Sequence, residues 1–252
     1  MEKTELYHYI FKRKSIRNYD LTPLDDITLK EISEYINSLK PICGDIKTEF
    51  KIISADYVKR RMMKEAPHYI AVFSEVKSGY LTNVGFMLQH VDLFFSANGL
   101  GCCWQGIPSP TRELLNSSNL EFVIFIAFGK PKDPESLHRI NISEFKRKAL
   151  GEITDIDGAD ELLEAARIAP SATNSQPWFF TGNKNLIHAC SVEPGFIKRF
   201  TKKYVPIDVG IAICHLQIAA EHFGKKTEIV FDKTAEADAP KGRKYIASLK
   251  ME

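Results

Sequence analysis

Two segments of the sequence are apolar on nearly every side and predict long, buried helices. The first runs from Val84 to Asn98 and the second from Val209 to Phe223, and a glycine follows each. A helix that is hydrophobic all round lies inside a protein rather than on its surface. Other elements must therefore cover both helices, and 252 residues are enough to bury a core of that size.

The two predicted helices match each other in register. Identical residues recur 125 positions apart in the two segments and the glycines that follow them: Val84 and Val209, Gly85 and Gly210, His90 and His215, Gly99 and Gly224. The tetrapeptide Phe11–Lys14 also recurs, as Phe145–Lys148. Two matches in the same order indicate an internal duplication. The predicted halves are residues 1–143 and 144–252, and we interpret both histidines as structural residues of buried helices.

Elsewhere the hydrophobic pattern changes between helical and strand periods. Apolar residues at helical spacing predict amphipathic helices over residues 26–39 and around residues 162–169, the second ended by Pro170. Short apolar runs predict strands at 50–53, 69–73, 122–128 and 228–231. This mixture predicts an α+β fold.

Charge and apolar runs exclude several classes of protein. Lysine and arginine number 34 against 32 aspartates and glutamates, for a net charge of +2, which disfavours a nucleic-acid binder. The longest apolar run has seven residues, too few for a membrane span, and residues 1–8 are too polar for a signal peptide. Five cysteines without a Cys-x-x-Cys spacing disfavour both disulfides and a zinc site. We therefore expect a cytoplasmic protein with no metal.

A basic motif near the N-terminus is the first candidate for chemistry. Arg13 and Arg17 flank Ser15 in Arg-Lys-Ser-Ile-Arg. Two guanidinium groups and a hydroxyl can converge on one phosphate. The alternative is a solvated basic patch at a helix end, which the spacing alone favours.

A polar loop between a helix and a strand is the second candidate. Residues 169–178 read Ala-Pro-Ser-Ala-Thr-Asn-Ser-Gln-Pro-Trp. Small residues allow the backbone to approach a flat ligand, and Asn174 and Gln176 offer paired donors and acceptors to a heteroaromatic edge. The alternative is a polar turn with two prolines.

A glycine-rich segment after the first buried helix is the third candidate. Residues 99–108 read Gly-Leu-Gly-Cys-Cys-Trp-Gln-Gly-Ile-Pro. The Gly-x-Gly follows a helix instead of joining a strand to a helix, so a dinucleotide-fold motif is excluded. We predict a loop whose backbone N–H groups face a ligand; the alternative is helix capping by Gly99 with Trp104 in the core.

Together these three motifs resemble the FMN-dependent nitroreductase family. That family has an Arg-x-Ser-x-Arg phosphate motif, a Pro-Ser-x-x-Asn-x-Gln-Pro-Trp loop, a Gly-Leu-Gly-x-Cys-Trp segment and an arginine after a late strand that ends in glycine. The resemblance implies FMN as cofactor, NADH or NADPH as electron donor, and a small electrophilic acceptor such as a nitroaromatic or a quinone. It implies these FMN contacts: Arg13, Lys14, Ser15, Arg17, Gln105, Gly106, Arg139, Pro170, Ser171, Ala172, Asn174 and Gln176.

The order of the motifs departs from the family, where the phosphate motif and the Asn/Gln loop both precede the central helix. Here residues 40–47, which follow the phosphate motif, lack the Ser/Asn/Gln set, and residues 145–151 lack the serine and second arginine. Family members are usually homodimers that build each site from both subunits. We therefore expect an intramolecular pseudo-dimer around buried central helices, active as a monomer, with one competent FMN site and one degenerate site.

The resemblance also sets the expected mechanism and its alternatives. Flavin supplies the redox chemistry, so no catalytic side chain is expected. A chain with one decayed site could instead bind flavin without turnover, or serve as a scaffold without cofactor. A nucleic-acid module built on the two Lys-Arg-Lys stretches is the remaining alternative, and it would bind in a strongly salt-dependent way.

Overall fold

The computed structural model describes residues 5–59, 63–192 and 202–252, so half of the polar N-terminal stretch, residues 1–4, lies outside it. The chain divides into two compact units that each combine separate stretches of sequence. The first unit comprises residues 1–11, 81–89 and 142–252, and the second comprises residues 12–80 and 90–141. The division into related halves at residues 143 and 144 stays a prediction.

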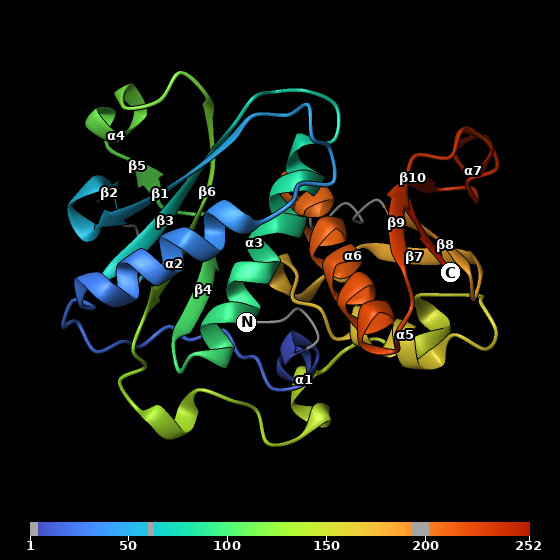
Figure 1. Ribbon diagram of the computed structural model, residues 1–252, viewed down its shortest axis with the longest axis horizontal. Coiled ribbons are helices and arrows are strands. Elements are labelled where there is room, and N and C mark those ends of the chain that lie inside the picture. Colours follow the sequence, from blue (N-terminus) through green and yellow to red (C-terminus); the bar gives the residue numbers. More distant parts are fainter. Residues whose placement is uncertain (1–4, 60–62, 193–201) are drawn as a thin grey trace. The chain divides into compact units, whose positions relative to one another are not determined.

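The second unit is built on a four-stranded antiparallel sheet (Figure 1). Its strands, in spatial order, are β1 (Thr48–Ser54), β3 (His68–Ser74), β6 (Glu121–Gly129) and β4 (Gly101–Gln105). Strand β3 is buried along its whole length, because its run of apolar residues occupies a central position of the sheet. A short ribbon pairs β2 (Val58–Lys59) with β5 (Ser109–Pro110).

Two helices of the second unit begin at capping side chains. Helix α2 (Asp26–Ser38) starts where Asp25 accepts a hydrogen bond from the backbone N–H of Thr28, at 2.9 Å. Tyr35 of this helix stacks on Phe94, with 4.1 Å between ring centroids. Helix α4 (Arg112–Asn116) is capped in the same way by Thr111.

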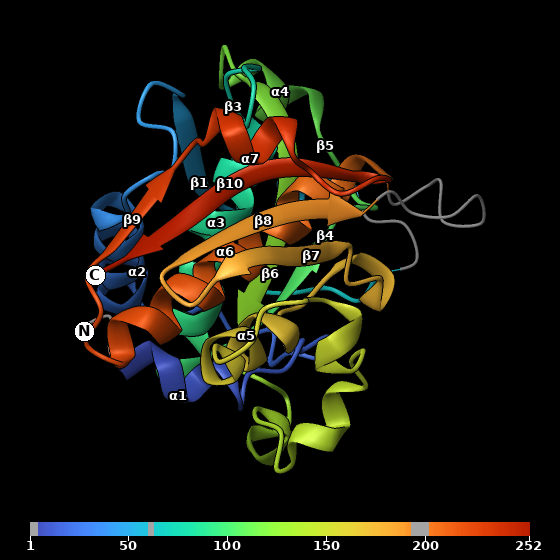
Figure 2. The ribbon, with the colours of Figure 1, turned by 90° about the vertical axis from the view of Figure 1, so that its right-hand side faces the viewer.

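The first unit contains a second antiparallel sheet, seen in Figure 2 with helix α6 (Val205–His222) behind it. Its strands, in spatial order, are β7 (Trp178–Asn183), β8 (Leu186–Val192), β10 (Arg243–Met251) and β9 (Thr227–Val230). Helix α6 packs on this sheet and against α1 (Leu6–Ile10) and α5 (Asp160–Arg167). Shorter elements are α7 (Lys233–Ala237), η2 (Ala55–Tyr57), η3 (Pro134–Ser136), η4 (Ile142–Phe145), η5 (Leu150–Glu152) and η6 (Ala172–Asn174).

Both predicted buried helices are confirmed, as α3 (Tyr80–Ala97) and α6. Each is followed by a glycine in the left-handed conformation, Gly99 at φ 75° and Gly224 at φ 77°. His215 is fully buried: its Nδ1–H donates to the carbonyl of Ala165 and its Nε2 accepts from Gln89, both at 2.9 Å. Both ring nitrogens of His215 therefore have hydrogen-bond partners inside the protein.

The predicted strands fall within β1, β3, β6 and, to one residue, β9, and the predicted α+β class is confirmed. The loop predicted over residues 99–108 is wrong in its central part. Residues 101–105 form strand β4, which pairs with β6 from Gly101 opposite Gly129 to Gln105 opposite Phe125. The glycines favour a loop, but an open sheet edge is available to satisfy this backbone. Within the described residues, no helix is long and apolar enough to cross a membrane.

Candidate functional site

The basic motif lies against strand β4. Ser15 forms a parallel bridge with Cys102, and the N–H of Ile16 donates to the carbonyl of Cys102 at 2.9 Å. The segment is thus extended and held by the edge strand, rather than being a solvated helix end. This placement fixes the direction of the side chains of residues 13–17.

Arg13 is the most constrained of these side chains. Its Nε lies 3.0 Å from Oδ1 of Asp92 in a buried ion pair in which each side chain is 1% exposed. The other carboxylate oxygen of Asp92 accepts from the indole N–H of Trp104 at 2.9 Å. Arg13 also donates to the hydroxyl of Ser15 at 3.1 Å. A buried charge must be paired and hydrogen-bonded, and these contacts meet that requirement.

Arg139 contacts the basic motif, whereas Arg17 is an exposed member of it. The backbone N–H of Arg139 donates to the carbonyl of Lys12 at 2.8 Å, and the guanidinium group of Arg139 donates to the carbonyl of Arg13. Arg17 is exposed and Lys14 is half-buried. The structure therefore brings Arg139 to the basic motif, although more than a hundred residues separate them in sequence.

Gln105 closes strand β4, and Gly106 follows it. The Gln105 side chain is 3% exposed, and its Oε1 accepts no hydrogen bond from the described residues. A buried carbonyl oxygen without a donor is costly, by about 1–3 kcal/mol. Such an atom marks a place where a ligand could supply the missing donor.

The loop over residues 170–176 has an unusual backbone. Thr173, Asn174 and Gln176 all have positive φ, between 49° and 57°. Non-glycine residues adopt this left-handed conformation at an energetic cost and keep it only where the surroundings hold them. The hydroxyl of Ser171 provides one such contact, because it accepts the N–H of Gln176 at 2.9 Å.

The two amide side chains of this loop hold the preceding chain segment. The Oε1 of Gln176 accepts the N–H of Lys148 at 2.7 Å, and its Nε2 donates to the carbonyl of Asn174 at 3.1 Å. Asn174 donates to the carbonyl of Lys146 at 2.9 Å and accepts from Arg147. Gln176 is buried, whereas Asn174 is exposed. The repeated Phe145–Lys148 stretch thus serves as the platform for the loop.

Aspartates in the buried helices are functional candidates that the sequence patterns missed. Asp208 of α6 accepts the N–H of Ala172 on both carboxylate oxygens, at 3.0 and 3.2 Å. Burial raises the pKa of Asp208 to about 8, against the opposing effect of that N–H group. A charged residue within an otherwise apolar helix was the available signal for both Asp208 and Asp92. Cys102 and Cys103 offer no nucleophile, because burial raises the pKa of both thiols.

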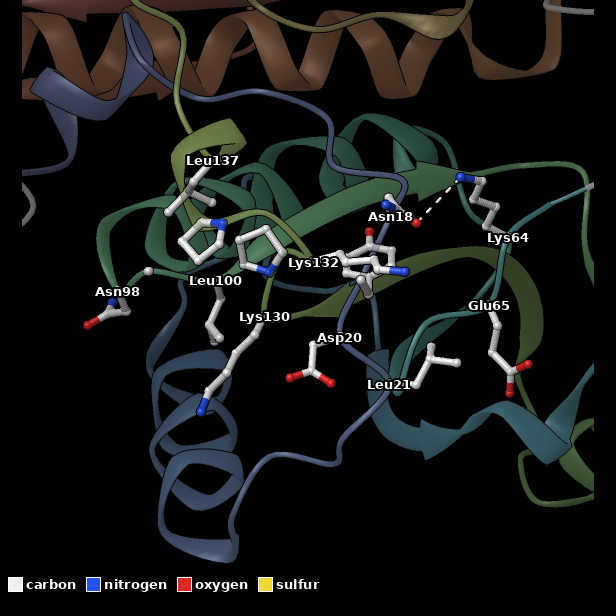
Figure 3. A pocket seen from close by; sticks show the side chains of 14 residues that line it. Asn18, Asp20, Leu21, Lys64, Glu65, Asn98, Leu100, Lys130, Lys132 and Leu137 are labelled. Atoms are coloured by element: carbon white, nitrogen blue, oxygen red, sulfur yellow. Dashed lines mark hydrogen bonds between the residues drawn. The ribbon is translucent and has the colours of Figure 1, made fainter.

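A separate surface pocket of about 900 Å³ lies in the second unit (Figure 3). Its charged lining residues are Asp20, Lys64, Glu65, Lys130 and Lys132. The Nζ of Lys64 donates to Oδ1 of Asn18 at 3.4 Å. Charges of both signs line the pocket, so its lining does not select for either cations or anions. None of the predicted FMN contacts is among its lining residues.

Comparison with solved structures shows the fold. A "putative nitroreductase" from Thermotoga maritima MSB8 aligns over 98% of this chain and 92% of its own, with a TM-score of 0.66 and 20% identity. An FMN-dependent nitroreductase from Clostridium difficile R20291 aligns over 55% of this chain and 96% of its own, with a TM-score of 0.45 and 14% identity. No curated protein matches the sequence.

The first of these structures covers nearly the whole chain and shows that the fold is an α+β nitroreductase-like one. The family model described as "Putative TM nitroreductase" matches residues 5–220. Because that match spans most of the 252 residues, the chain belongs to this nitroreductase family.

Proposed function

We propose that this protein is an FMN-dependent oxidoreductase that passes reducing equivalents from NADH or NADPH to a small electrophilic acceptor, such as a nitroaromatic or a quinone. Family membership supports the reaction class. The observation that carries the proposal for this chain is the cluster beside β4. There Arg13 contacts both Ser15 and Arg139, and the strand ends at Gln105, whose Oε1 has no hydrogen-bond partner among the described residues.

The donors present suit a flavin mononucleotide. Ser15, Arg17 and Arg139 would hold the phosphate, since guanidinium groups and a hydroxyl match its oxygens. Lys14 would add a positive charge, and Arg13 would fix the motif through its ion pair with Asp92 as well as contribute to the phosphate contacts. Gln105 and the backbone N–H of Gly106 would meet the isoalloxazine ring.

The 170–176 loop offers a second set of contacts. Pro170, Ser171 and Ala172 present a backbone with small side chains, to which the polar groups of Asn174 and Gln176 add donors and acceptors. Two further buried polar atoms close by in the sequence lack partners among the described residues, Ser175 Oγ and Trp178 Nε1. Unpartnered donors and acceptors at a preformed loop favour a polar ligand there.

Chemically, FMN when bound would accept hydride from the reduced nicotinamide and deliver reducing equivalents to the acceptor. The residues of this chain would bind and orient it. Positive charge from the arginines would neutralise the phosphate, and hydrogen bonds from the loop would hold the ring and the ribityl chain. No side chain need act as a nucleophile.

We also propose that residues 1–143 and 144–252 are related halves that form an intramolecular pseudo-dimer with one competent site. The 125-residue register of the two central helices supports this proposal, as do the matching close approaches of Gly85 to Ile207 and of Gly210 to Thr82. The phosphate motif occurs only in the first half and the Asn/Gln loop only in the second. One FMN per chain follows.

The test is reconstitution with FMN, removal of the excess, and release of the bound flavin by acid to count flavin per chain. Anaerobic oxidation of NADH and NADPH with a nitroaromatic or a quinone then measures turnover. We expect one FMN per chain and turnover with at least one acceptor. Bound FMN without turnover would indicate a flavin-binding protein that is not an enzyme. A chain that binds no FMN would instead be a scaffold. Two equivalent flavins per chain would contradict the single-site proposal.

Arg17→Ala is the sharpest variant, because this exposed side chain can be removed without disturbing the core. We expect at least about tenfold weaker FMN binding, as one charge-assisted contact to phosphate is lost. Arg112→Ala, at an exposed arginine of α4 outside every predicted contact, is the matched control. Equal FMN affinity in the two variants would show that Arg17 does not contact the cofactor.

A further inference from the structure

Asp208 is a buried acidic side chain that the proposed chemistry leaves without a role. It lies in the first turn of α6 and is 3% exposed. Both of its carboxylate oxygens face a single donor, the N–H of Ala172. Among the described residues this is its one hydrogen-bond donor, so the carboxyl group and the loop depend on each other.

Ala172 is the point where the strained part of the loop begins. It opens the short turn η6, in which the N–H of Asn174 donates to Ser171 and that of Ser175 donates to Ala172, at 3.0 and 3.1 Å. Thr173 and Asn174 follow directly in the left-handed conformation. A strained backbone of this kind needs an anchor at each end. Gln176 provides one at Lys148, and Asp208 provides the other.

We propose that Asp208 is a positioning residue of the FMN site: by accepting the N–H of Ala172, it holds residues 171–176 in the backbone conformation that binds the flavin. This inference rests on the proposed function. It assigns to α6 an effect on cofactor affinity that needs no contact between Asp208 and the cofactor.

The matched position in the other central helix suggests the conservative variant. Asn83 lies 125 positions before Asp208, in Asn83-Val84-Gly85 against Asp208-Val209-Gly210. Asparagine keeps a carbonyl oxygen that can accept the Ala172 N–H but cannot ionise. Asp208→Asn should therefore preserve the anchor, whereas Asp208→Leu removes the acceptor while keeping the branched shape of the side chain.

The experiment measures two quantities for the full chain: the Kd for FMN, from quenching of flavin fluorescence, and the hydrogen-exchange rate of the Ala172 amide in the FMN-free protein. For Asp208→Leu we expect at least about tenfold weaker FMN binding and at least about tenfold faster exchange, since the amide loses its acceptor. For Asp208→Asn we expect both quantities within about threefold of the wild type, because the acceptor remains. Asp238→Leu, at an exposed aspartate, is the matched control and should leave both unchanged.

The outcomes separate this inference from the function on which it rests. If the wild type binds FMN and folded Asp208→Leu binds it equally well, the positioning role is overturned while the proposed function stands. If the wild type binds no FMN, the proposed function fails and this role fails with it. An unchanged exchange rate at Ala172 in Asp208→Leu would also overturn the inference, because the anchor would then be dispensable.

A second variant decides the matter if Asp208→Leu does not fold. Asp208→Ala removes the same acceptor and adds no atom to this buried position, so it cannot overpack the core. We expect the same loss of FMN affinity as for Asp208→Leu. Wild-type affinity in this variant would show that the hydrogen bond to Asp208 is not needed.

Discussion

Gly85 and Gly210 make the same contact in opposite directions where helices α3 and α6 cross. A Cβ atom on Gly85 would lie 2.1 Å from the carbonyl oxygen of Ile207, and one on Gly210 would lie 2.1 Å from that of Thr82. Ile207 and Thr82 are themselves 125 positions apart, as the two glycines are. Such reciprocity is expected where two helices cross about a local twofold axis, as the proposed pseudo-dimer requires.

This crossing predicts that Gly85→Ala and Gly210→Ala each destabilise the protein, by about 3 kcal/mol, near the upper end for overpacking. Helix propensity acts the other way, since alanine is favoured over glycine in a helix interior by about 1 kcal/mol. The steric clash should outweigh the gain in helix propensity, because the contacted atoms belong to the backbone and cannot move aside. Urea denaturation measures the loss. Gly151→Ala, an exposed glycine with open space around it, is the control; stable variants at 85 and 210 would argue against close backbone packing.

The buried ion pair predicts a large loss when one partner is neutralised. Asp92→Asn leaves the Arg13 charge buried without a counter-charge, and we expect about 3–5 kcal/mol less stability in urea denaturation. Adding Arg13→Met removes the remaining charge, while the introduced amide oxygen would still accept from Trp104, so the double variant should recover most of the loss. Glu34→Gln, which breaks the exposed pair with Lys30, should cause no measurable change. If the stability losses of Asp92→Asn and Arg13→Met were additive in the double variant, this account would be contradicted.

Asp208 predicts a pH dependence of stability. Its pKa is raised from 3.8 to about 8 in the folded protein, so between these values the folded state holds a proton that the unfolded state has released. The contribution of Asp208 to the free energy of unfolding is therefore fully present below about pH 4. As the pH rises toward 8, this contribution falls by about 1.4 kcal/mol per pH unit. Urea denaturation of wild type and Asp208→Asn at a series of pH values between these limits measures the slope. The difference between them should shrink as pH falls, and parallel profiles would exclude a raised pKa.

Gln105 predicts opposite effects on stability and on cofactor binding. Gln105→Met replaces Oε1, which has no partner in the described part of the chain, with an apolar group of similar length. The FMN-free protein should therefore be as stable as the wild type or more stable, by about 1 kcal/mol. FMN affinity should fall about tenfold, because the acceptor predicted to face the ring is lost. Thermal unfolding and flavin-fluorescence titration measure the two effects. A drop in stability with unchanged affinity would mean that Gln105 is a structural residue.

The sequence predicted those elements whose signals are local. The two buried helices, their terminal glycines and the apolar strands follow from the lengths of apolar runs and from turn chemistry, which are set by a few neighbouring residues. The motifs around Arg13, Gly99 and Asn174 were visible for the same reason. Strand β4 was missed because pairing with β6, rather than its own glycines and cysteines, makes residues 101–105 a strand.

The tertiary structure alone decided which groups share a neighbourhood. Nothing in the sequence indicates that Arg13 pairs with Asp92 or that Asp208 anchors Ala172, and only the family resemblance placed Arg139 near the basic motif. These contacts join residues from 36 to 126 positions apart, so they depend on how the elements pack. Local composition determines which backbone conformations are low in energy. Whether a charged side chain is buried, and with which partner, is determined only when the whole core forms.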